Sequence, residues 1–153
     1  VYEYARDESI TMMLYYPKTY EETQDYVTRA AAEWHSASPR YLEFMLEYGG
    51  RVIGGCDLDV LGGGTYEIGW ELNRAFRGMG FGSEGASAVL GYAFGTLGAE
   101  RVVAHCDCRN AASENVMKKL GMKLADSTQT RRYRNGTVSG ELEYSIPADE
   151  YYK

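Results

Sequence analysis

The chain has 153 residues, of which 44% are hydrophobic and 25% are charged, with a formal net charge of −6 and a pI of about 5.0. This length and composition predict one globular domain spanning residues 1–153. The negative charge argues against a nucleic-acid backbone as partner and mildly favours a cationic ligand, although many domains are acidic simply for solubility. No apolar run is long enough for a membrane span and no secretory signal is visible. The first residue is Val1, so we expect the native N-terminus to lie upstream.

The cysteines are few and odd in number: Cys56, Cys106 and Cys108. Such a set predicts reduced thiols and a cytoplasmic location. Cys106 and Cys108 are two residues apart, so on a strand they would face the same side. No second pair and no histidine cluster accompanies them, so no bound metal is expected.

The first half of the chain predicts a short helix and then an antiparallel meander. Val1–Asp7 resembles a helix fragment, and Thr19 to Glu22 forms a capping box that starts a helix running to about Trp34. Its predicted apolar stripe consists of Tyr20, Val27, Ala30, Ala31 and Trp34. Three strands follow, joined by glycine turns at 49–50 and 62–64: Tyr41–Glu47, Arg51–Val60 and Thr65–Leu72.

The second half predicts a strand between two helices, followed by a hairpin. The first helix is expected over Ser83–Leu97, closed by Gly98, and a strand over Arg101–Asp107. Asn110 is the expected cap of a helix that runs through Leu120. The dipeptide Asn135-Gly136 joins two further predicted strands, Thr130–Arg134 and Thr137–Ile146. The expected fold is therefore α/β, with a mixed, mostly antiparallel twisted sheet and helices on both faces.

A glycine-rich turn between the third strand and the next helix is the most informative segment: Arg77, Gly78, Met79, Gly80, Phe81, Gly82 and Ser83. Glycines let the backbone approach a ligand closely, and free amides at a helix N-terminus favour a phosphate. Arg77 adds a cation. A Rossmann pattern would require a parallel unit and an acidic residue downstream, and a Walker pattern would require Gly-Lys-Ser/Thr. A turn without any ligand is the remaining alternative.

Several segments resemble GNAT N-acetyltransferases, in particular the branch that contains the ribosomal-protein-alanine N-acetyltransferases. The Arg-x-x-Gly-x-Gly loop is similar to the pyrophosphate loop of this family, and the other matching segments occur in the family's order: Tyr66–Asn73, Tyr92–Phe94, Leu97-Gly98, Cys106–Ser113 and Lys119–Met122. The resemblance implies an enzyme that moves an acetyl group from acetyl-CoA to an amine. Relatives begin with one more strand, which this sequence is expected to lack.

The resemblance also implies where acetyl-CoA binds. In the family, two central strands separate at their ends and the pantetheine arm lies in the gap. That arm would lie beside Leu72 and Asn73, and the pyrophosphate would bind the amides of Met79–Ser83. Asn110 and Ser113 would complete the cofactor-binding set near the reacting sulfur.

The resemblance implies that Ser113 donates a proton or a hydrogen bond to the leaving thiolate. Many family members use a tyrosine for this step, but the matching position here is Met117. Ser113, three residues after Asn110, is the serine that this branch uses instead. The alternative is an ordinary first-turn serine that satisfies a free backbone amide.

The base that takes the proton of the amine is expected on the central strand. Glu67 and Glu71 share one face with Gly69, and Glu67 matches the family's strand acid best. Glu141 and Glu143 on the last strand are alternatives, as is a solvated polar face with no catalytic role. The basic stretch Thr130–Arg134 occupies a place where some relatives carry an acid.

The remaining candidates favour structural roles. His105 and Asp107 share a strand face while Cys106 points the other way, so His105 is interpreted as a structural histidine, and His35 as a partner of a helix dipole. The 14 tyrosines and two tryptophans are mainly packing residues, with an aromatic acceptor cleft or a homodimer surface as alternatives.

The acceptor, a small amine or a protein N-terminus, is not identified by the segment Met12–Thr19 or by the last hairpin. A non-catalytic acyl-CoA-binding module and a nucleotide-binding enzyme remain alternatives.

Overall fold

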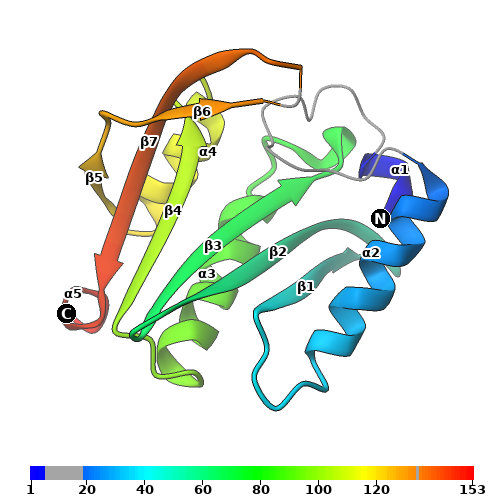
Figure 1. Cartoon of the computed structure of the whole chain (residues 1–153), viewed down its shortest axis with the longest axis horizontal. Helices are drawn as coiled ribbons and strands as arrows, with labels where there is room; N and C mark the ends of the chain where they lie inside the picture. Colours follow the sequence, from blue (N-terminus) through cyan, green and yellow to red (C-terminus); the bar gives the residue numbers. More distant parts are fainter. Residues whose placement is uncertain (6–18, 134) are drawn as a thin grey trace.

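The computed structural model describes residues 1–5, 19–133 and 135–153 (Figure 1). Its elements in chain order are α1 (Tyr2–Ala5), α2 (Tyr20–Glu33), β1 (Tyr41–Tyr48), β2 (Arg51–Gly62), β3 (Thr65–Leu72), η2 (Arg74–Phe76), α3 (Phe81–Gly95), β4 (Arg101–Asp107), α4 (Ala111–Lys119), β5 (Lys123–Asp126), β6 (Thr130–Arg132), β7 (Val138–Pro147) and α5 (Ala148–Tyr151). The rest of the predicted Val1–Asp7 helix and most of the segment Met12–Thr19 lie outside the described residues.

The strands form one seven-stranded sheet in the order β1-β2-β3-β4-β7-β5, with β6 pairing β7. Every pair is antiparallel except β3 with β4, which is parallel because α3 is the crossover between them. The predicted meander and the predicted parallel pair are both confirmed. The mixed α/β architecture expected from the sequence is confirmed as well.

Some element boundaries differ from the prediction. The helix α3 begins at Phe81 rather than Ser83, because Gly80 adopts φ 93° and is itself the N-cap residue. It ends at Gly95, two residues before the predicted Leu97. The short strand β5 and the helix α5 were not predicted. The four residues of β5 are mostly exposed and show no alternation between buried and exposed side chains, so they carry no periodic signal.

The hydrophobic core lies between the sheet and the helices α3 and α4. One face of the central strands contributes side chains that alternate along each strand, such as Ile68 on β3. The helix α3 contributes Ala86, Val89, Leu90, Ala93 and Phe94, and α4 contributes Met117, which is 1% exposed. Met117, at the position where many relatives carry tyrosine, is therefore a core residue.

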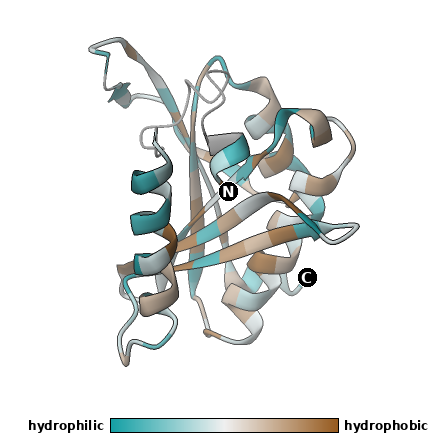
Figure 2. Ribbon diagram, turned by 90° about the vertical axis from the view of Figure 1, so that its right-hand side faces the viewer, coloured by the Kyte–Doolittle hydropathy of each residue, from teal (hydrophilic) through white to brown (hydrophobic). Residues whose placement is uncertain are grey.

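The opposite face of the sheet carries several carboxylates beside the buried Ile53 and Val103, and α2 packs against β1 at one side of the sheet (Figure 2). The predicted apolar stripe of α2 is wrong in most of its members: Tyr20, Val27, Ala31 and Trp34 are exposed, and only Ala30 is buried. The side that is turned inward consists of Thr23, Tyr26, Ala30 and Glu33. The prediction failed because it assumed an apolar partner, whereas Tyr26 of α2 donates a hydrogen bond to the carboxylate of Glu43 on β1. The predicted start is confirmed, since Thr19 Oγ1 accepts from the Glu22 amide at 3.1 Å.

Candidate active site

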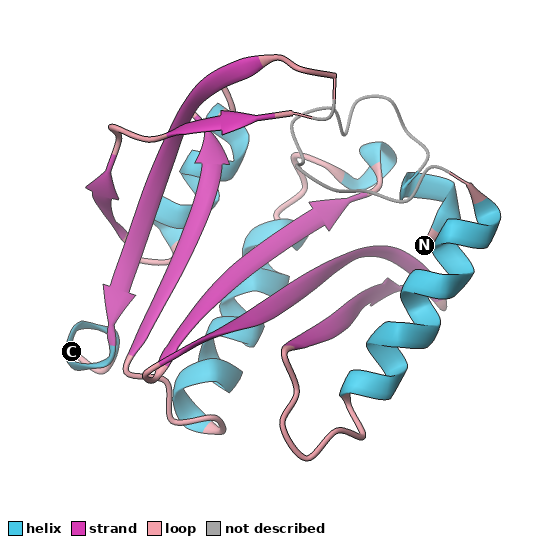
Figure 3. Ribbon diagram, viewed as in Figure 1, coloured by secondary structure: helices cyan, strands magenta, loops and turns pink. Residues whose placement is uncertain are grey.

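The strands β3 and β4 are paired over only part of their length. Their partners are Thr65 with Arg101, Tyr66 with Val102 and Glu67 with Val103. Beyond Glu67, β3 continues to Leu72 and β4 to Asp107 without further pairs between them. The two arrows start side by side and separate toward their tips (Figure 3). Unpaired backbone groups of two strands therefore line a gap that can accept an extended ligand.

The glycine-rich loop follows the tip of β3 and leads into α3. Gly78 and Gly80 have φ values of 76° and 93°, which strongly favour glycine. Gly80 caps α3 without a side-chain hydrogen bond, and the amide of Glu84 is bonded to the carbonyl of Gly80 at 3.0 Å. The amides that precede Glu84 have no acceptor within the helix, because the first turn of any helix lacks one. The loop thus combines free donors with the positive end of the helix dipole.

Arg77 has a role that the sequence did not indicate. Its Nε donates to the carbonyl oxygen of Leu72 at 3.0 Å. Asn73 is also engaged: its amide donates to Ile53 O at 2.8 Å, and its side chain caps η2 by accepting from the Ala75 amide at 3.0 Å. Because strand residues alternate in direction and Asn73 faces β2, the backbone of Leu72 faces the gap. These bonds fix the end of β3 and the start of the loop.

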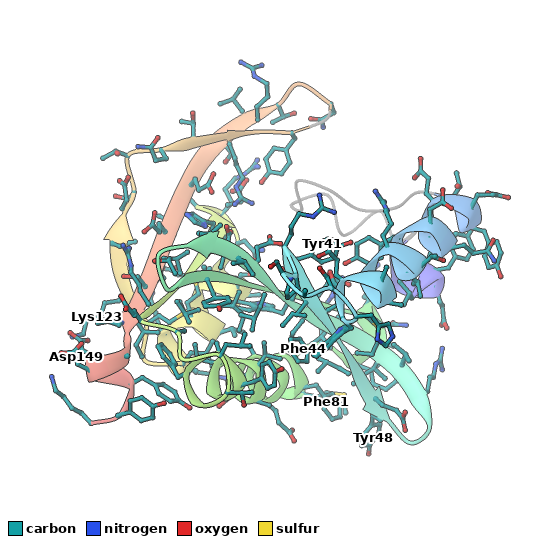
Figure 4. All side chains as sticks on the ribbon, turned by 60° about the horizontal axis from the view of Figure 1, so that its bottom comes forward. Tyr41, Phe44, Tyr48, Phe81, Lys123 and Asp149 are labelled. Carbon is teal, nitrogen blue, oxygen red and sulfur yellow. The ribbon has the colours of Figure 1, made fainter. Side chains whose placement is uncertain are left out.

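Close packing explains a further glycine of the loop. Gly82 is buried, and a Cβ atom there would lie 3.1 Å from Cδ1 of Leu72. The phenyl ring of Phe81 packs on Tyr48, with ring centroids 4.9 Å apart (Figure 4). Gly78, Met79 and Gly80, in the middle of the loop, are exposed. The loop is therefore anchored at its end by Phe81 and Gly82 and open to solvent in its middle.

Glu67 lies where β3 and β4 separate, and it takes part in a chain of polar contacts across three strands. Its Oε1 is 2.8 Å from Nδ1 of His105 on β4. Nε2 of His105 is 3.3 Å from Oε2 of Glu143 on β7, and Glu143 Oε1 pairs with Arg101 at 2.8 Å. The hydrogen bond to Glu67 is the main cause that raises the pKa of His105 above its usual 6.5. His105 thus contacts two residues that the sequence named as candidate bases, Glu67 and Glu143.

Further carboxylates lie on the same sheet face, and the sequence did not single out Glu43, Asp57 or Asp59 among them. Burial is the main cause that raises the pKa of Glu43 to about 7 and that of Asp57 to about 8, with the neighbouring carboxylates adding to it. A Cβ atom at Gly69 would lie 2.5 Å from Oδ1 of Asp57, and one at Gly55 would lie 3.3 Å from Oε1 of Glu71. Gly69 is the β3 partner of Asp57, and Gly55 is the β2 partner of Glu71, so each carboxylate lies over the glycine on the neighbouring strand. The alternation of acids along β2 was the signal that could have revealed Asp57.

The first turn of α4 carries Ser113 near the tip of β4. The side chain of Asn110 accepts from the amide of Ser113 at 3.1 Å, so the predicted cap is confirmed. Ser113 is half-buried. Because the cap uses the backbone of Ser113, its hydroxyl is not needed to satisfy that amide.

The turn before α4 is held by the buried carboxylate of Asp107. It accepts from Arg109 through the backbone amide at 2.8 Å and through two guanidinium nitrogens at 2.8 and 2.7 Å. It also accepts from Tyr133 Oη at 2.5 Å and from Ser139 Oγ at 3.0 Å. These donors, Arg109 first among them, hold the pKa of Asp107 far below its usual value. Asp107 therefore links β4 and the start of α4 to the β6–β7 hairpin.

Glu141, the remaining candidate base, forms an ion pair with the buried Arg131 at 3.1 Å. Arg131 belongs to the basic stretch Thr130–Arg134, so this stretch neutralises an acid on the neighbouring strand.

Cys56 and Cys106 are buried and Cys108 is exposed, all three as free thiols. Cys108 follows the end of β4 at Asp107, so the expectation that it shares a side with Cys106 does not hold.

The comparisons with known proteins agree with this geometry. A model of the acetyltransferase (GNAT) domain family matches residues 1–123. The chain belongs to the GNAT acetyltransferase family. The uncharacterized N-acetyltransferase YnaD of Bacillus subtilis (strain 168) is 32% identical over 126 residues, which are 80% of this chain and 71% of that protein. This GNAT protein is therefore an N-acetyltransferase that uses acetyl-CoA, as the sequence predicted.

Solved GNAT structures share the fold over nearly the whole chain. The acetyltransferase (GNAT family) from Bacillus anthracis is 26% identical with a TM-score of 0.83, and the match covers 98% of this chain and 88% of that one. The spermidine N-acetyltransferase from Vibrio cholerae, solved in complex with CoA and spermine, is 13% identical with a TM-score of 0.84, covering 99% and 90%. The second likeness concerns the fold alone.

Within residues 1–5, 19–133 and 135–153, no three His, Cys, Asp or Glu side chains are grouped so that they could hold a metal ion. No helix in the same part of the chain is long and apolar enough to cross a membrane.

Proposed function

We propose that this GNAT enzyme acetylates a primary amine by direct attack in a ternary complex, with Glu67 as the base. The observation that carries the proposal is the position of Glu67 in the last residue pair before β3 and β4 separate. A carboxylate at this point faces the gap from the acidic side of the sheet. It can hold an ammonium group and accept its proton before the neutral amine attacks.

The residues around the gap fit acetyl-CoA, which supplies the acetyl thioester. The open amides of Met79–Ser83 and the N-terminus of α3 suit a pyrophosphate, because they combine free donors with a positive dipole. Leu72 and Asn73 end the strand whose free edge suits an extended pantetheine arm. Arg77 and Gly78 shape the entrance of the loop. Asn110 fixes the first turn of α4, from which the Ser113 hydroxyl can donate a hydrogen bond to the leaving sulfur.

The acidic sheet face favours a small amine with more than one positive charge over a peptide N-terminus. Its carboxylates come from three neighbouring strands and lie on the side opposite the core, away from α3 and α4: Glu43, Asp57, Asp59, Glu67 and Glu71. Cationic groups are attracted to such a surface. The solved spermidine acetyltransferase relative, which holds spermine, is an enzyme of this substrate class.

The test is the release of free CoA thiol from acetyl-CoA with a panel of polyamines, aminoglycosides and N-terminal peptides. We expect turnover with at least one polyamine or aminoglycoside. Glu67→Gln should lower kcat on that amine about 10²–10⁴-fold, since a positioned base typically contributes this much. Glu21→Gln, an equal change of charge at an exposed position on α2, should leave kcat unchanged. Full activity of Glu67→Gln would refute the assignment of the base, and turnover of peptides alone would refute the acceptor class.

A further inference from the structure

His105 makes two polar contacts, and the shorter one joins it to the proposed base, Glu67. The 2.8 Å contact joins Nδ1 to Glu67, and the 3.3 Å contact joins Nε2 to Glu143. The shorter contact is the stronger hydrogen bond, so Nδ1–H donates to the Glu67 carboxylate in the neutral imidazole. The atom that gains and loses a proton near neutral pH is then Nε2.

The charge of His105 is set by groups from four strands. Glu67 on β3 and Glu143 and Glu141 on β7 favour the imidazolium ion. Arg101 on β4 binds Glu143 at 2.8 Å, and Arg131 on β6 binds Glu141 at 3.1 Å, so both β7 acids are already partly neutralised. Within the part of the chain that the structure describes, no arginine or lysine forms an ion pair with Glu67. The carboxylate whose charge His105 governs most directly is thus Glu67.

We propose that His105 is a positioning residue whose charged form competes with the cationic acceptor for Glu67. The inference rests on the proposed function, in which Glu67 receives the acceptor ammonium. When Nε2 carries a proton, the imidazolium neutralises Glu67 and weakens its attraction for a second cation. When Nε2 loses that proton, the full negative charge of Glu67 is available while Nδ1–H keeps the carboxylate in place.

The geometry allows this competition at Glu67. The side chains of Glu67 and His105 are 33% and 23% exposed, so both are partly accessible to solvent and to a ligand. His105 lies two residues beyond Val103, the β4 partner of Glu67, and therefore projects on the same sheet face where the strands begin to separate. Binding of a cation at Glu67 and protonation of His105 must oppose each other, since each disfavours the other to the same degree.

A probe of constant charge separates this effect from titration of the amine itself. Hexamethonium is a bis-quaternary dication that cannot lose a proton, so any pH dependence of its inhibition comes from the protein. Its inhibition constant against the best amine of the panel would be measured from pH 5.5 to 8.5. We expect inhibition to tighten about three- to tenfold as the pH rises through the pKa of His105, which lies above 6.5.

The chain supplies its own control, because it contains two histidines. His105→Gln keeps a donor for Glu67 without a charge and should reduce the pH dependence to what Glu43 and Asp57 contribute, whereas His35→Gln should retain it in full, since His35 is exposed just after α2. If His105→Gln does not fold, proton release on hexamethonium binding by the parent enzyme with CoA, measured by calorimetry in two buffers at pH 6.5, serves instead. Proton release that persists in a variant carrying Glu43→Gln and Asp57→Asn supports the proposal, and its absence overturns it.

The outcomes distinguish the inference from the function on which it rests. A pH-independent inhibition constant in the parent, or equal pH dependence in His105→Gln, would overturn the role of His105 while leaving Glu67 as the base if Glu67→Gln is inactive. Full activity of Glu67→Gln would overturn both. Failure of hexamethonium to inhibit at pH 8.5 would also overturn the inference, because Glu67 would then attract no cation.

Discussion

Gly80 and Gly82 are two residues apart in the loop, but they are glycines for different reasons. Gly80 has a φ of 93° and open space around the position of a Cβ atom. Gly82 has no such backbone requirement, and a side chain there is disfavoured because its Cβ atom would lie 3.1 Å from Cδ1 of Leu72. A side chain at Gly80 therefore strains the loop directly, whereas one at Gly82 pushes α3 away from β3.

Replacement of Gly80 by alanine tests the loop with the smallest possible side chain. Forcing an L-residue into this conformation costs about 1–2 kcal/mol, which corresponds to a loss of about 5- to 30-fold in CoA affinity if the loop must keep its shape to bind. Isothermal titration with CoA measures the loss. Gly95→Ala is the control, because it adds the same methyl group to open space at the other end of α3 without a positive φ. Equal CoA affinity of Gly80→Ala and the parent would argue against a loop-bound pyrophosphate.

Ser113 is the second prediction for a single residue. We expect Ser113→Ala to lower kcat about 10²-fold, the low end of the 10²–10⁴-fold range for general acid help, because a thiolate is already a good leaving group. CoA affinity should change little, since the cap of α4 uses the Ser113 amide and the Asn110 side chain. Steady-state kinetics at several pH values, together with CoA titration, measure both quantities. An unchanged kcat across that pH range would make the serine structural.

Among the elements, the junction of β4, α4 and the β6–β7 hairpin depends most on one side chain. Removing a partner from a buried charged cluster typically costs about 3–5 kcal/mol, so Asp107→Ala should lower the free energy of unfolding by about that amount. Chemical denaturation measures it. Asp149→Ala is the control, because it breaks an exposed ion pair, 3.7 Å from Lys153, and should change stability far less. A small effect at Asp107 would mean that Arg109 and Tyr133 are satisfied by water.

The elements that the sequence predicted well are those with a strong periodic or turn signal. The meander, α3 and β4 combine alternation or helical spacing with glycine turns, and their order implied the parallel pair. The polar inner side of α2 could not be predicted, because the periodicity of a helix does not tell which kind of surface it will cover. Asp107 is a similar case: two of its five donors, Tyr133 and Ser139, come from the hairpin, and contacts so distant in sequence leave no local pattern.

The candidate site was predictable where a motif is contiguous. The loop Arg77–Ser83 and the segment ending in Ser113 are continuous stretches, so the resemblance located both. The contacts of His105 join three strands, and only the fold brings them together. The role of Arg77 was predicted less well, because a bond to the Leu72 carbonyl cannot be distinguished from a phosphate contact in sequence. The homodimer and the cytoplasmic location remain predictions.

At the scale of the whole molecule, the acidic sheet face sets how stability depends on pH. Glu43, Asp57 and His105 all have raised pKa values, so the folded state holds more protons than the unfolded state at mildly acidic and neutral pH. Their contribution is present below the unfolded pKa values and is lost as the pH rises through the folded ones. Asp107 acts in the opposite direction, because its lowered pKa gives a contribution that is lost as the pH falls below about 4.

We therefore expect the free energy of unfolding to fall by at least about 1 kcal/mol between pH 5 and pH 8.5. This is less than the roughly 1.4 kcal/mol that corresponds to a shift of one pKa unit in a single group. Urea denaturation at closely spaced pH values measures the slope. Asp57→Asn removes the carboxyl group whose pKa is raised to about 8 and should flatten the curve, whereas Asp25→Asn on the exposed side of α2 should not. Stability that rises over this interval would contradict the prediction.

The place of β7 in the sheet has a consequence for biosynthesis. β7 follows all other strands in the chain, yet it lies between β4 and β5 and also pairs β6. While a ribosome is still adding residues 101–137, β4 and β5 expose backbone donors and acceptors that only β7 will satisfy. The meander of β1, β2 and β3 can assemble early from local contacts, but its neighbours must wait. Any pause in translation before Val138 thus prolongs the interval in which the nascent chain can pair wrongly with another copy of itself.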